Sequence, residues 1–531
     1  MADWKVAFDS FRSTNRIIHG WGKIAGDGLF PSRVDLEIYD GEALVTKTTP
    51  AIINGNKETN TKTNEMAFII YSTCSSHHKN TRYFLNLVWF NNKSIRVEIP
   101  PPQQINKRHF LFGHLDHPWK HYINRGWRLI HQGQWSLFFR KLINMGRAAF
   151  NSGLTPKKLL QWASRGYKNC ALIVDHDLGG GANIYRTRIT DEYRANGASP
   201  IILTAHHGLI SYQLIGKRNR RYRFAHTRDL NEVFSELSKT DVNEVIFNNI
   251  LSFPYPLTVI ETLSNWLKAN PKIKLTFLLH DFYCICPSWL LLNNNRSYCD
   301  IPKIDKCSTC IATNPAPFLS LAENLDITNW RKTWSSLLIQ ANEIRCFSNS
   351  SRNLLIKAHP NLDHSVITVI PHLPLSKLRP IHLFDSGCPV VCVIGHISEH
   401  KGSKIVQALA HYAYSNNYKL RIIVVGTIDI QLPPEIAVVN GPYEQIDLPE
   451  ILERYQVNIG LFPSICPETF SFVTTEMMEM KLPIASFGLG AQGEKITGYT
   501  RGEIIPFQTP ESVLESINNL YEQYIKTKKL P

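Results

Sequence analysis

The sequence predicts an α/β protein preceded by a small all-β module. Three observations carry this prediction. The chain has 531 residues, too many for a single hydrophobic core, so two to four domains are expected. From Trp21 to Pro100, short runs alternate apolar and polar residues, as strands with one buried face do. After Cys170, apolar strand-like runs alternate with helical runs, which is typical of a parallel sheet covered by helices.

The first module covers residues 1–110 and is predicted to be a small β-sandwich. Its strand-like runs are V-D-L-E-I-Y, A-L-V-T-K-T, A-F-I-I-Y and F-L-N-L-V-W-F. Turn pairs such as Asp40-Gly41 and Asn91-Asn92 separate them.

The net charge of +14 favours anionic partners, namely phosphorylated substrates, acidic lipid or nucleic acid. The first residues, M-A-D-W-K-V-A-F-D-S-F-R, lack the apolar stretch of a secretory signal, and no run of about eighteen apolar residues occurs. We therefore expect a cytoplasmic protein. Its eleven cysteines should then be reduced thiols or metal ligands rather than disulfides.

Residues 111–165 are predicted to form a basic, Trp-rich helical linker. No acidic residue occurs between Asp116 and Asp175, whereas ten Lys or Arg residues and four Trp residues do. Such a segment suits an interfacial helix on an anionic membrane surface, and it also suits a linker helix packed on the next domain. No nucleic-acid partner is expected, because no zinc-finger, RNA-recognition or K-homology signature accompanies the charge. A second basic run, Lys217–Phe224, either holds an anionic or lipid-linked acceptor or is solvated.

Residues 166–375 are predicted to form the first α/β domain. The strand Cys170–Asp175 leads into a glycine loop, where Gly180 and Gly181 let the backbone approach a ligand and open a helix that offers N–H groups to phosphate. The loop is not a dinucleotide fingerprint, since Ile184 stands at its third glycine position.

Two later strands of this domain end in polar side chains. Ile273–Leu279 is followed by His280, and Glu343–Phe347 is followed by Ser348 and Asn349. Ligands of parallel sheets bind beyond the carboxyl ends of the strands, so these side chains are candidates for lining a cleft.

Cysteines cluster in the segment after His280. A C-x7-C-x2-C run with one further cysteine would supply the four thiolates of a tetrahedral zinc site, namely Cys286, Cys299, Cys307 and Cys310. The usual second C-x2-C pair is absent, so free thiols without metal are the alternative. Any metal here would be structural and would pin a loop.

Residues 376–531 are predicted to form the second α/β domain, which contains two carboxylates eight positions apart, Glu468 and Glu476. The three residues after Glu468 are expected to open a helix, and eight positions of a continuous helix span about 12 Å. The first turn of such a helix offers free N–H groups and a partial positive charge to a diphosphate, and the carboxylates accept hydrogen bonds from sugar hydroxyls. An ordinary amphipathic helix with Glu on its wet face is the alternative.

In this order along the chain, these motifs resemble those of the retaining family 4 glycosyltransferases, which carry an E-x7-E signature. The resemblance covers about residues 170–525 and is strongest from Pro389 to Gly493. It implies the GT-B fold, in which two Rossmann-like domains face a cleft. The N-terminal acceptor domain would be 166–375, and the C-terminal domain that binds the nucleotide-sugar donor would be 376–531.

The resemblance also implies roles for single residues. Glu468 would hold the donor sugar, Glu476 the nucleotide ribose, and Lys401 the diphosphate. His396 stands where the family has arginine, so phosphate stabilisation is weaker unless the imidazole is protonated or another arginine reaches in. Further donor contacts are implied for Gly395, Tyr443, Thr469, Phe470, Ser471 and Phe472. On the acceptor and phosphate side the implied residues are His280, as a catalytic residue, Gly180, Gly181, Ser348 and Asn349.

The implied function is transfer of a hexosyl unit from a nucleotide diphosphate-sugar to a hydroxyl of a polysaccharide or lipid-linked glycan, with retention of configuration. A peripheral membrane enzyme of polysaccharide biosynthesis accounts best for the basic segment. No cofactor is needed for catalysis, because Lys401 and backbone N–H groups would neutralise the leaving diphosphate. The 1–110 module is weakly similar to β-rich modules of some bacterial polysaccharide glycosyltransferases, and a structural role is favoured over sugar binding.

Two rival functions stay open. One is a catalytically silent relative that binds nucleotide or sugar as a scaffold, which His396 favours. The other is a different user of two Rossmann-like domains, such as an epimerase or a dehydrogenase, and the missing dinucleotide fingerprint speaks against a dehydrogenase.

Overall fold

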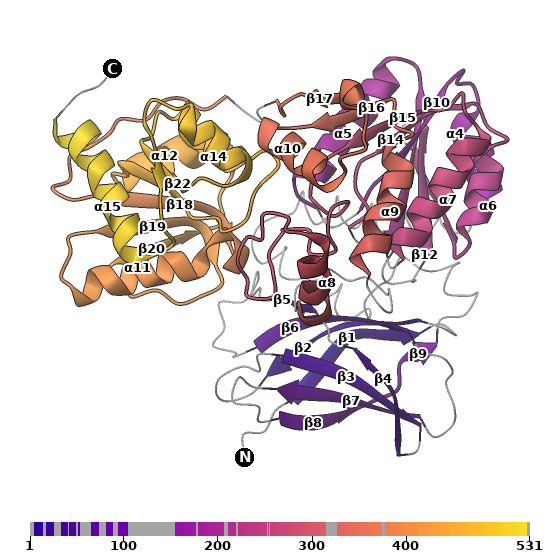
Figure 1. Ribbon diagram of the computed structural model, residues 1–531, viewed down its shortest axis with the longest axis horizontal. Coiled ribbons are helices and arrows are strands. Elements are labelled where there is room, and N and C mark those ends of the chain that lie inside the picture. The colour runs from indigo at the N-terminus through magenta and orange to yellow at the C-terminus, as the bar shows by residue number, and fades with distance from the viewer. Residues whose placement is uncertain are drawn as a thin grey trace. The chain divides into compact units, whose positions relative to one another are not determined.

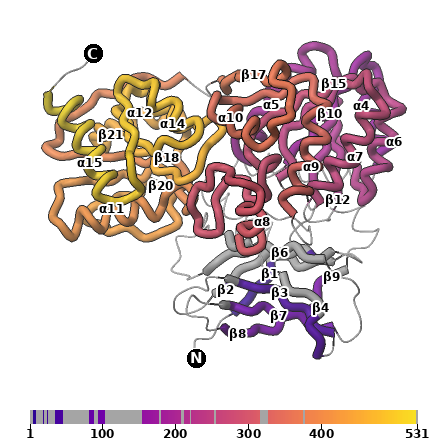
Figure 2. The backbone as a smooth tube through the Cα atoms, in the orientation of Figure 1, coloured from indigo at the N-terminus to yellow at the C-terminus, as the bar shows by residue number. Residues whose placement is uncertain are grey.

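The computed structural model describes most of the chain, and Figures 1 and 2 show its course. The chain divides into two compact units, of which the first is 1–278 with 317–325 and 332–343, and the second is 279–316 with 326–331 and 344–531. Most of the predicted linker at 111–165 lies outside the described residues. These are 5–13, 17–25, 33–40, 42–48, 51–53, 65–73, 81–88, 94–104, 154–176, 179–206, 211–218, 221–251, 253, 255–314, 326–373 and 377–527.

Two β-sheets open the first unit, and their pairings are antiparallel except that of β1 with β9. One has the order β5-β6-β2-β1-β9, with β1 (Lys5–Ser13), β2 (Ile17–Ala25), β5 (Ala51–Ile53), β6 (Glu65–Thr73) and β9 (Gln103–Gln104). The other has the order β4-β3-β7-β8, with β3 (Arg33–Asp40), β4 (Ala43–Thr48), β7 (Thr81–Val88) and β8 (Ser94–Ile99).

The core of this module takes side chains from both sheets. Ile18 and Ile24 of β2 belong to the same buried cluster as Leu36 of β3 and Leu85 of β7. Alternate residues of β3 and β7 therefore point into a layer shared by the two sheets. This is the small β-sandwich that the alternating runs predict.

An eight-stranded sheet follows, in the order β13-β12-β11-β10-β14-β15-β16-β17. Its strands are β10 (Cys170–Val174), β11 (Ser199–His206), β12 (Ser211–Arg218), β13 (Arg221–Thr227), β14 (Val242–Phe247), β15 (Lys274–Leu278), β16 (Glu343–Cys346) and β17 (Ile367–Val369). Its helices are α4 (Pro156–Ser164), α5 (Gly181–Ala195), α6 (Leu230–Leu237), α7 (Pro256–Ala269), α9 (Ile327–Leu338) and α10 (Asn349–Ala358). Apolar strands such as β10, buried along their whole length, form its centre.

One edge of this sheet differs from the expected parallel alternation. Strands β12 and β13 form an antiparallel hairpin on β11, so the sheet is mixed. Only two residues join these strands, and so short a connection allows antiparallel pairing alone. The described residues of the basic run Lys217–Phe224 belong to the last residues of β12 and the first of β13. Among them, Arg223 lies 4.6 Å from the ring of Trp162 and Lys217 lies 4.9 Å from that of Tyr222.

The second unit contains a six-stranded parallel sheet in the order β20-β19-β18-β21-β22-β23. Its strands are β18 (Val390–Ile397), β19 (Arg421–Ile428), β20 (Ala437–Gly441), β21 (Ile459–Phe462), β22 (Ile484–Phe487) and β23 (Gly502–Ile505). Its helices are α11 (Ser403–Ser415), α12 (Leu448–Arg454), α13 (Phe472–Glu479), α14 (Gly490–Thr497) and α15 (Pro510–Tyr521), and α8 (Ile304–Thr313) belongs to the same unit. Short 3₁₀ turns occur at His364–Val366, Glu399–Lys401 and Gln445–Asp447, and a π-helical turn at Glu522–Lys526.

Helices cover both faces of this second sheet. Apolar side chains of α11 and α15 share one buried cluster with the strands, and those of α12, α13 and α14 share the other. The fold class is therefore confirmed: an α/β protein with two Rossmann-like sheets and an antiparallel module before them.

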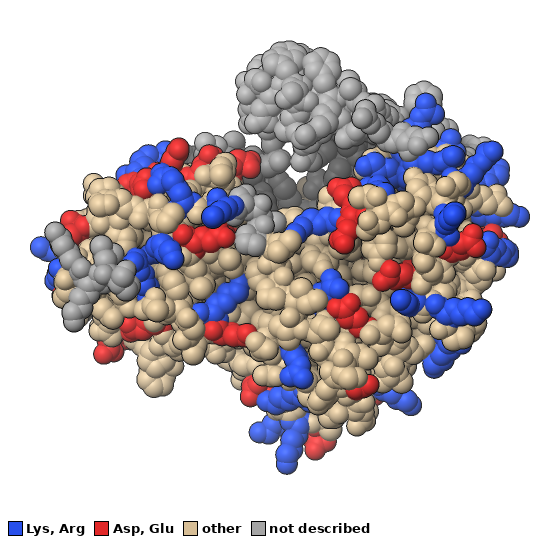
Figure 3. Space-filling model, turned by 90° about the horizontal axis from the view of Figure 1, so that it is seen from above, with Lys and Arg blue, Asp and Glu red and all other residues tan. Residues whose placement is uncertain are grey.

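On the face drawn in Figure 3, basic side chains gather toward one edge and alternate with acidic ones elsewhere. Among the described helices, none combines the length and the apolar character needed to cross a bilayer.

Candidate functional site

The candidate site lies at the carboxyl ends of the strands of the second sheet. The parallel strands β18, β21 and β22 end at the same edge, and three connections leave them there. These are the turn around Lys401, the loop 463–471, and the turn Gly488–Gly490 before α14. Five of the ten donor-side residues predicted from the sequence stand in these connections, namely Lys401, Glu468, Thr469, Phe470 and Ser471.

Glu468 and Lys401 form an ion pair in this site. The Lys401 Nζ lies 3.6 Å from Glu468 Oε1, and the two side chains are 37% and 22% exposed. Both groups are therefore partly desolvated and still reachable by a ligand. The backbone of Glu468 is fixed from α14, because its N–H donates to Gln492 Oε1 at 3.0 Å and its carbonyl accepts from the Ala491 N–H at 2.9 Å.

Gly402 brings the Lys401 turn against the loop that carries Glu468. Its φ of 86° is left-handed, and a Cβ built on it would lie 2.1 Å from the carbonyl oxygen of Pro463. Only glycine allows this approach of two backbones. The spacing of Lys401 and Glu468 therefore depends on this contact.

We expect Gly402→Ala to cost about 2–4 kcal/mol of unfolding free energy, because the methyl group meets main chain and the left-handed conformation strains alanine. Urea denaturation would measure the loss. Gly498→Ala is the matched control, since a Cβ there would meet nothing closer than 3.8 Å. Equal stability of the two variants would contradict the assigned contact.

The helix between the two glutamates begins later than expected. Helix α13 starts at Phe472, and Thr469, Phe470 and Ser471 form a turn rather than its first residues. Ser471 has φ 64° and ψ 90°, a left-handed conformation that breaks the helix from Glu468. The expectation that Thr469, Phe470 and Ser471 open this helix is therefore wrong, and the helix-start amides are those after Ser471.

Lys495, which the sequence reasoning missed, holds this turn. From α14 its Nζ donates to the Ser471 carbonyl at 3.0 Å and to Thr475 Oγ1 at 2.6 Å. The same ammonium lies 3.4 Å from the ring centroid of Phe470. Burial lowers the pKa of Lys495 to about 8, although Glu468 and Glu494 oppose the shift.

The side chains of Phe470 and Ser471 are buried, so only their backbone can face a ligand. Phe470 lies under Lys495, and the Ser471 hydroxyl bonds that of Thr474 at 2.8 Å. The ring of Phe472 lies 4.9 Å from that of Phe470. The predicted donor contacts of Phe470 and Ser471 therefore fall on main-chain groups, whereas the side chain of Phe472 is half-buried.

Glu476 is a buried carboxylate, 8% exposed, in the middle of α13. Gln445, also missed from the sequence, donates from Nε2 to Glu476 Oε1 at 2.7 Å. Burial raises the pKa of Glu476, while the Gln445 hydrogen bond and Lys401 lower it. One oxygen is thus fixed by the protein.

We expect Glu476→Gln to keep or raise stability at neutral pH. The folded-state pKa of Glu476 lies above its unfolded value, so its contribution to stability is lost as the pH rises through that folded-state pKa. Glutamine keeps the acceptor for Gln445 and carries no buried charge. If Glu476 holds a ribose, the same change weakens nucleotide binding about tenfold. Urea denaturation at pH 7 and nucleotide titration measure the two effects, and a less stable variant would contradict the first.

Gly395 and His396 lie at the end of β18. The His396 Nδ1 is 2.7 Å from Thr427 Oγ1, which fixes the imidazole against β19. His400, one residue before Lys401, is partly buried, and burial with nearby Lys401 and His396 lowers its pKa to about 4. His400 is therefore neutral at physiological pH.

His280 lies in a cluster of aromatic rings. Its ring centroid is 4.7 Å from that of Phe347 and 5.4 Å from that of His372, a buried histidine that the sequence reasoning missed. His372 in turn lies 5.0 Å from Phe470. The carbonyl of His280 accepts a hydrogen bond from Thr469 Oγ1 at 3.0 Å. The structure thus brings His280 next to the loop that carries Glu468.

Ser348 and Asn349 stand at the start of α10, and both are committed to protein contacts. The Ser348 hydroxyl caps the helix by accepting from the Ser351 N–H at 3.1 Å. Glu494 of α14 accepts from the N–H groups of Asn349 and Ser350 at 3.2 and 2.7 Å, and from Asn349 Nδ2 at 2.8 Å. A carboxylate of the protein itself therefore occupies this helix start.

Gly180 and Gly181 belong to the first unit. Gly180 has φ 84° and precedes α5, which begins at Gly181. Asn183 holds the loop, since its Oδ1 accepts from the Gly179 N–H at 2.6 Å and its Nδ2 donates to Asp175 at 2.7 Å. Burial raises the pKa of Asp175 to about 6.

Tyr443 borders a cavity of about 610 Å³ in the second unit, lined also by acidic side chains of the Glu444–Glu450 segment and by Arg454. Burial raises the pKa of Tyr443 to about 12, and Glu476 adds to that rise. Its hydroxyl therefore stays protonated, and the residue lies near the second glutamate.

The four cysteines of the predicted zinc site are all described. Within the described residues, no group of three or more His, Cys, Asp or Glu side chains is arranged to hold a metal ion. Cys307 and Cys310 instead accept hydrogen bonds at 3.6 Å from Arg331 and Asn314. The zinc site stays a prediction.

The fold and the site define a class: an α/β protein whose second Rossmann-like sheet presents, at its strand ends, an acid-lysine pair, a strained helix start and a buried second carboxylate. No protein-family model matches the sequence. No curated protein matches it either.

Several solved structures are similar to the chain. The Anabaena protein Alr3699/HepE in complex with UDP has a TM-score of 0.43 and 14% identity, covering 67% of this chain and 91% of that one. A glycosyltransferase from Rickettsia africae has a TM-score of 0.37 and 16% identity, covering 68% of this chain and 89% of that one. A TarM mutant of S. aureus has a TM-score of 0.37 and 12% identity, covering 60% of this chain and 57% of that one. It was solved in complex with fondaparinux, alpha-GlcNAc-glycerol and UDP. Similarity at this level assigns no activity to this chain.

Proposed function

We propose that this protein is a glycosyltransferase that moves a sugar from a nucleotide diphosphate-sugar to a hydroxyl of a glycan or lipid-linked acceptor, with retention. The observation that carries the proposal is the Glu468–Lys401 pair beside the strained start of α13. It combines an acceptor for sugar hydroxyls with a cation and free amides for a diphosphate.

In the proposed complex each residue has one task. Glu468 accepts hydrogen bonds from the donor sugar, and Glu476 accepts one from the ribose with the oxygen that Gln445 leaves free. Lys401 and the first amides of α13 bind the diphosphate. The Lys495 ammonium lies just behind them and adds positive charge, which offsets the weaker donor capacity of His396 relative to arginine.

The proposed reaction needs no cofactor and no protein nucleophile. The bond between the anomeric carbon and the diphosphate oxygen breaks, and the acceptor oxygen forms its bond to that carbon on the same face. The acceptor proton passes to an oxygen of the departing diphosphate. Lys401 and the helix-start amides stabilise the charge that develops on the leaving group, an effect commonly worth several kcal/mol.

A thermal-shift screen of UDP-, GDP- and TDP-sugars tests the donor, followed by a transfer assay on the best hit. Binding of one donor together with transfer or slow hydrolysis supports the proposal. The second candidate is a silent nucleotide- or sugar-binding scaffold, which is favoured by His396 at the position where the resembled family has arginine. Binding without release of nucleoside diphosphate from any donor would favour the scaffold, and no binding of any donor would overturn both.

A further inference from the structure

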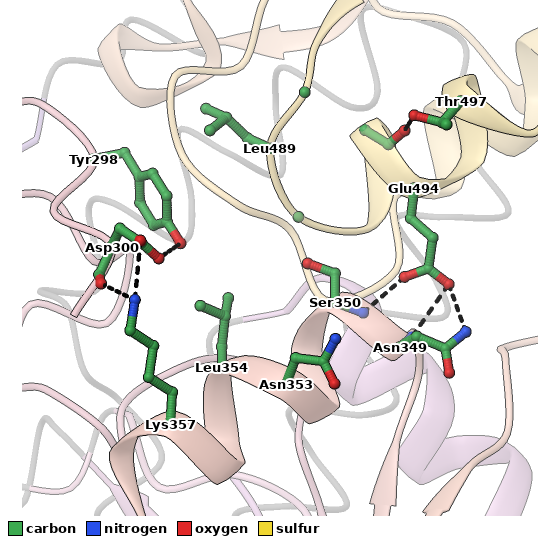
Figure 4. A pocket seen from close by; sticks show the side chains of 13 residues that line it. Tyr298, Asp300, Asn349, Ser350, Asn353, Leu354, Lys357, Leu489, Glu494 and Thr497 are labelled. Atoms are coloured by element: carbon green, nitrogen blue, oxygen red, sulfur yellow. Dashed lines mark hydrogen bonds and ion pairs between the residues drawn. The ribbon is translucent and has the colours of Figure 1, made fainter.

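A cavity of about 700 Å³ lies beside the candidate donor site, within the second unit. Figure 4 shows its walls, which come from α10, from the turn before α14 with α14 itself, and from the segment around Tyr298. None of the predicted donor-binding residues lines it. Its volume is that of an ordinary small-molecule site.

The cavity adjoins the loop that carries Glu468. Gly490, in its lining, has φ 55°, and a Cβ built there would lie 2.6 Å from the Glu468 nitrogen. The next residue, Ala491, donates its N–H to the Glu468 carbonyl. One turn of chain therefore forms a wall of the cavity and the support of Glu468.

The charges of the cavity are already paired. Lys357 Nζ lies 2.9 Å from Asp300 Oδ2 and donates to the Asp300 carbonyl at 2.6 Å. Glu494 accepts the hydrogen bonds of the α10 start, as Figure 4 shows. An anionic ligand would meet two carboxylates and a lysine that is already bound, so the lining disfavours phosphate or an acidic sugar.

The remaining lining suits a neutral ligand rich in hydroxyls. Asn353 is exposed, and its amide offers two donors and an acceptor. Tyr298 is half-buried, and its ring, with Leu354 and Leu489, gives apolar area for the C–H faces of a sugar. Ser350 and Thr497 add hydroxyl groups. Amide, hydroxyl and ring together are the usual composition of a polar site with one apolar wall.

We propose that this cavity binds a neutral saccharide, the end of the glycan acceptor. The assignment of this cavity as the acceptor subsite rests on the proposed function, in which a bound acceptor places a hydroxyl next to the donor sugar at Glu468. Saccharide binding in the cavity is independent of that function and can be tested alone.

The test uses saturation-transfer NMR on the full chain with millimolar glucose, galactose and N-acetylglucosamine, and with glucuronic acid and glucose 6-phosphate as charged counterparts. We expect neutral saccharides to give signal, charged ones little, and Asn353→Phe, which fills the cavity, to reduce the signal about tenfold. Tyr298→Ala should reduce it as well. Asn361→Ala, an exposed asparagine outside the lining, should leave it unchanged.

Nucleotide-induced thermal shift, measured on the same samples, separates the two proposals. Unchanged shift in both cavity variants with lost saccharide signal supports the subsite. Saccharide signal that survives both variants, a preference for the charged sugars, or no signal in the parent protein would overturn it. Failure of the parent protein to bind any nucleotide-sugar would overturn the proposed function instead.

Discussion

Glu468→Gln is expected to lower the transfer rate on the order of 100- to 1,000-fold, because charged hydrogen bonds to two sugar hydroxyls are weakened together. The effect should appear mainly in kcat, since these bonds orient the sugar for cleavage. Binding of the nucleoside diphosphate alone should change less than about threefold, as Glu468 does not contact that part of the donor in the proposed complex. Steady-state kinetics and nucleotide titration measure the two quantities.

Glu515→Gln is the matched control for this prediction. Glu515 is an exposed residue of α15, far along the chain from the strand-end loops, and the same loss of charge should leave the rate unchanged. A Glu468→Gln protein that transfers sugar as fast as the parent would remove Glu468 from the donor site. Equal loss of nucleotide binding and transfer would indicate instead that Glu468 maintains the local fold.

The strands of the site could be predicted from sequence because they are buried on both faces. Val390–Ile397 and Ile459–Phe462 are nearly continuous apolar runs, and such runs mark central parallel strands. Once the strands are known, their carboxyl ends gather the loops after them. The roles expected of Lys401 and Glu468 came instead from the resemblance to the family 4 glycosyltransferases, and the structure brings the two side chains together.

The residues of the site that could not be predicted depend on contacts between positions distant in the sequence. The local sequence before α13 predicts a helix start, but Ser471 is not helical. Its carbonyl accepts a hydrogen bond from Lys495, which lies 24 positions later in the chain. Lys495 belongs to no recognisable motif. It lies within the short helix α14, and nothing in the sequence around it marks it as part of a site. Likewise Gln445 lies 31 positions before the carboxylate that it binds. Local patterns hold no information on such pairs.

The hairpin β12–β13 was missed for a different reason. Strand–helix alternation predicts crossovers, and a hairpin placed at the edge between β11 and α6 leaves that alternation intact on either side. The basic residues of its end also resemble a loop more than a strand. An edge strand carries charged residues without penalty, because one side of it remains in solvent.

Lys495→Met is expected to lower the transfer rate about 100-fold at pH 7, because the ammonium both holds the helix-start turn and adds positive charge behind the diphosphate amides. Methionine keeps the apolar stem over Phe470 and loses the two hydrogen bonds to Ser471 and Thr475. The left-handed conformation of Ser471 costs of order 1–3 kcal/mol, so without these hydrogen bonds Ser471 is free to leave it. Lys419→Met, at an exposed lysine of the same unit, should leave the rate unchanged.

The pH dependence separates a role in activity from a role in stability. Burial lowers the pKa of Lys495 to about 8, with Glu468 and Glu494 as the charged groups that oppose it. The rate of the parent protein should therefore fall above about pH 8 as the ammonium loses its proton, and Lys495→Met should lack this decline. Stability moves the other way: between the folded pKa and the higher unfolded one, the unfolded chain binds more protons, so this residue's contribution to stability rises with pH. If the rate instead followed the stability curve, or if the methionine variant kept the alkaline decline, Lys495 would be a structural lysine only.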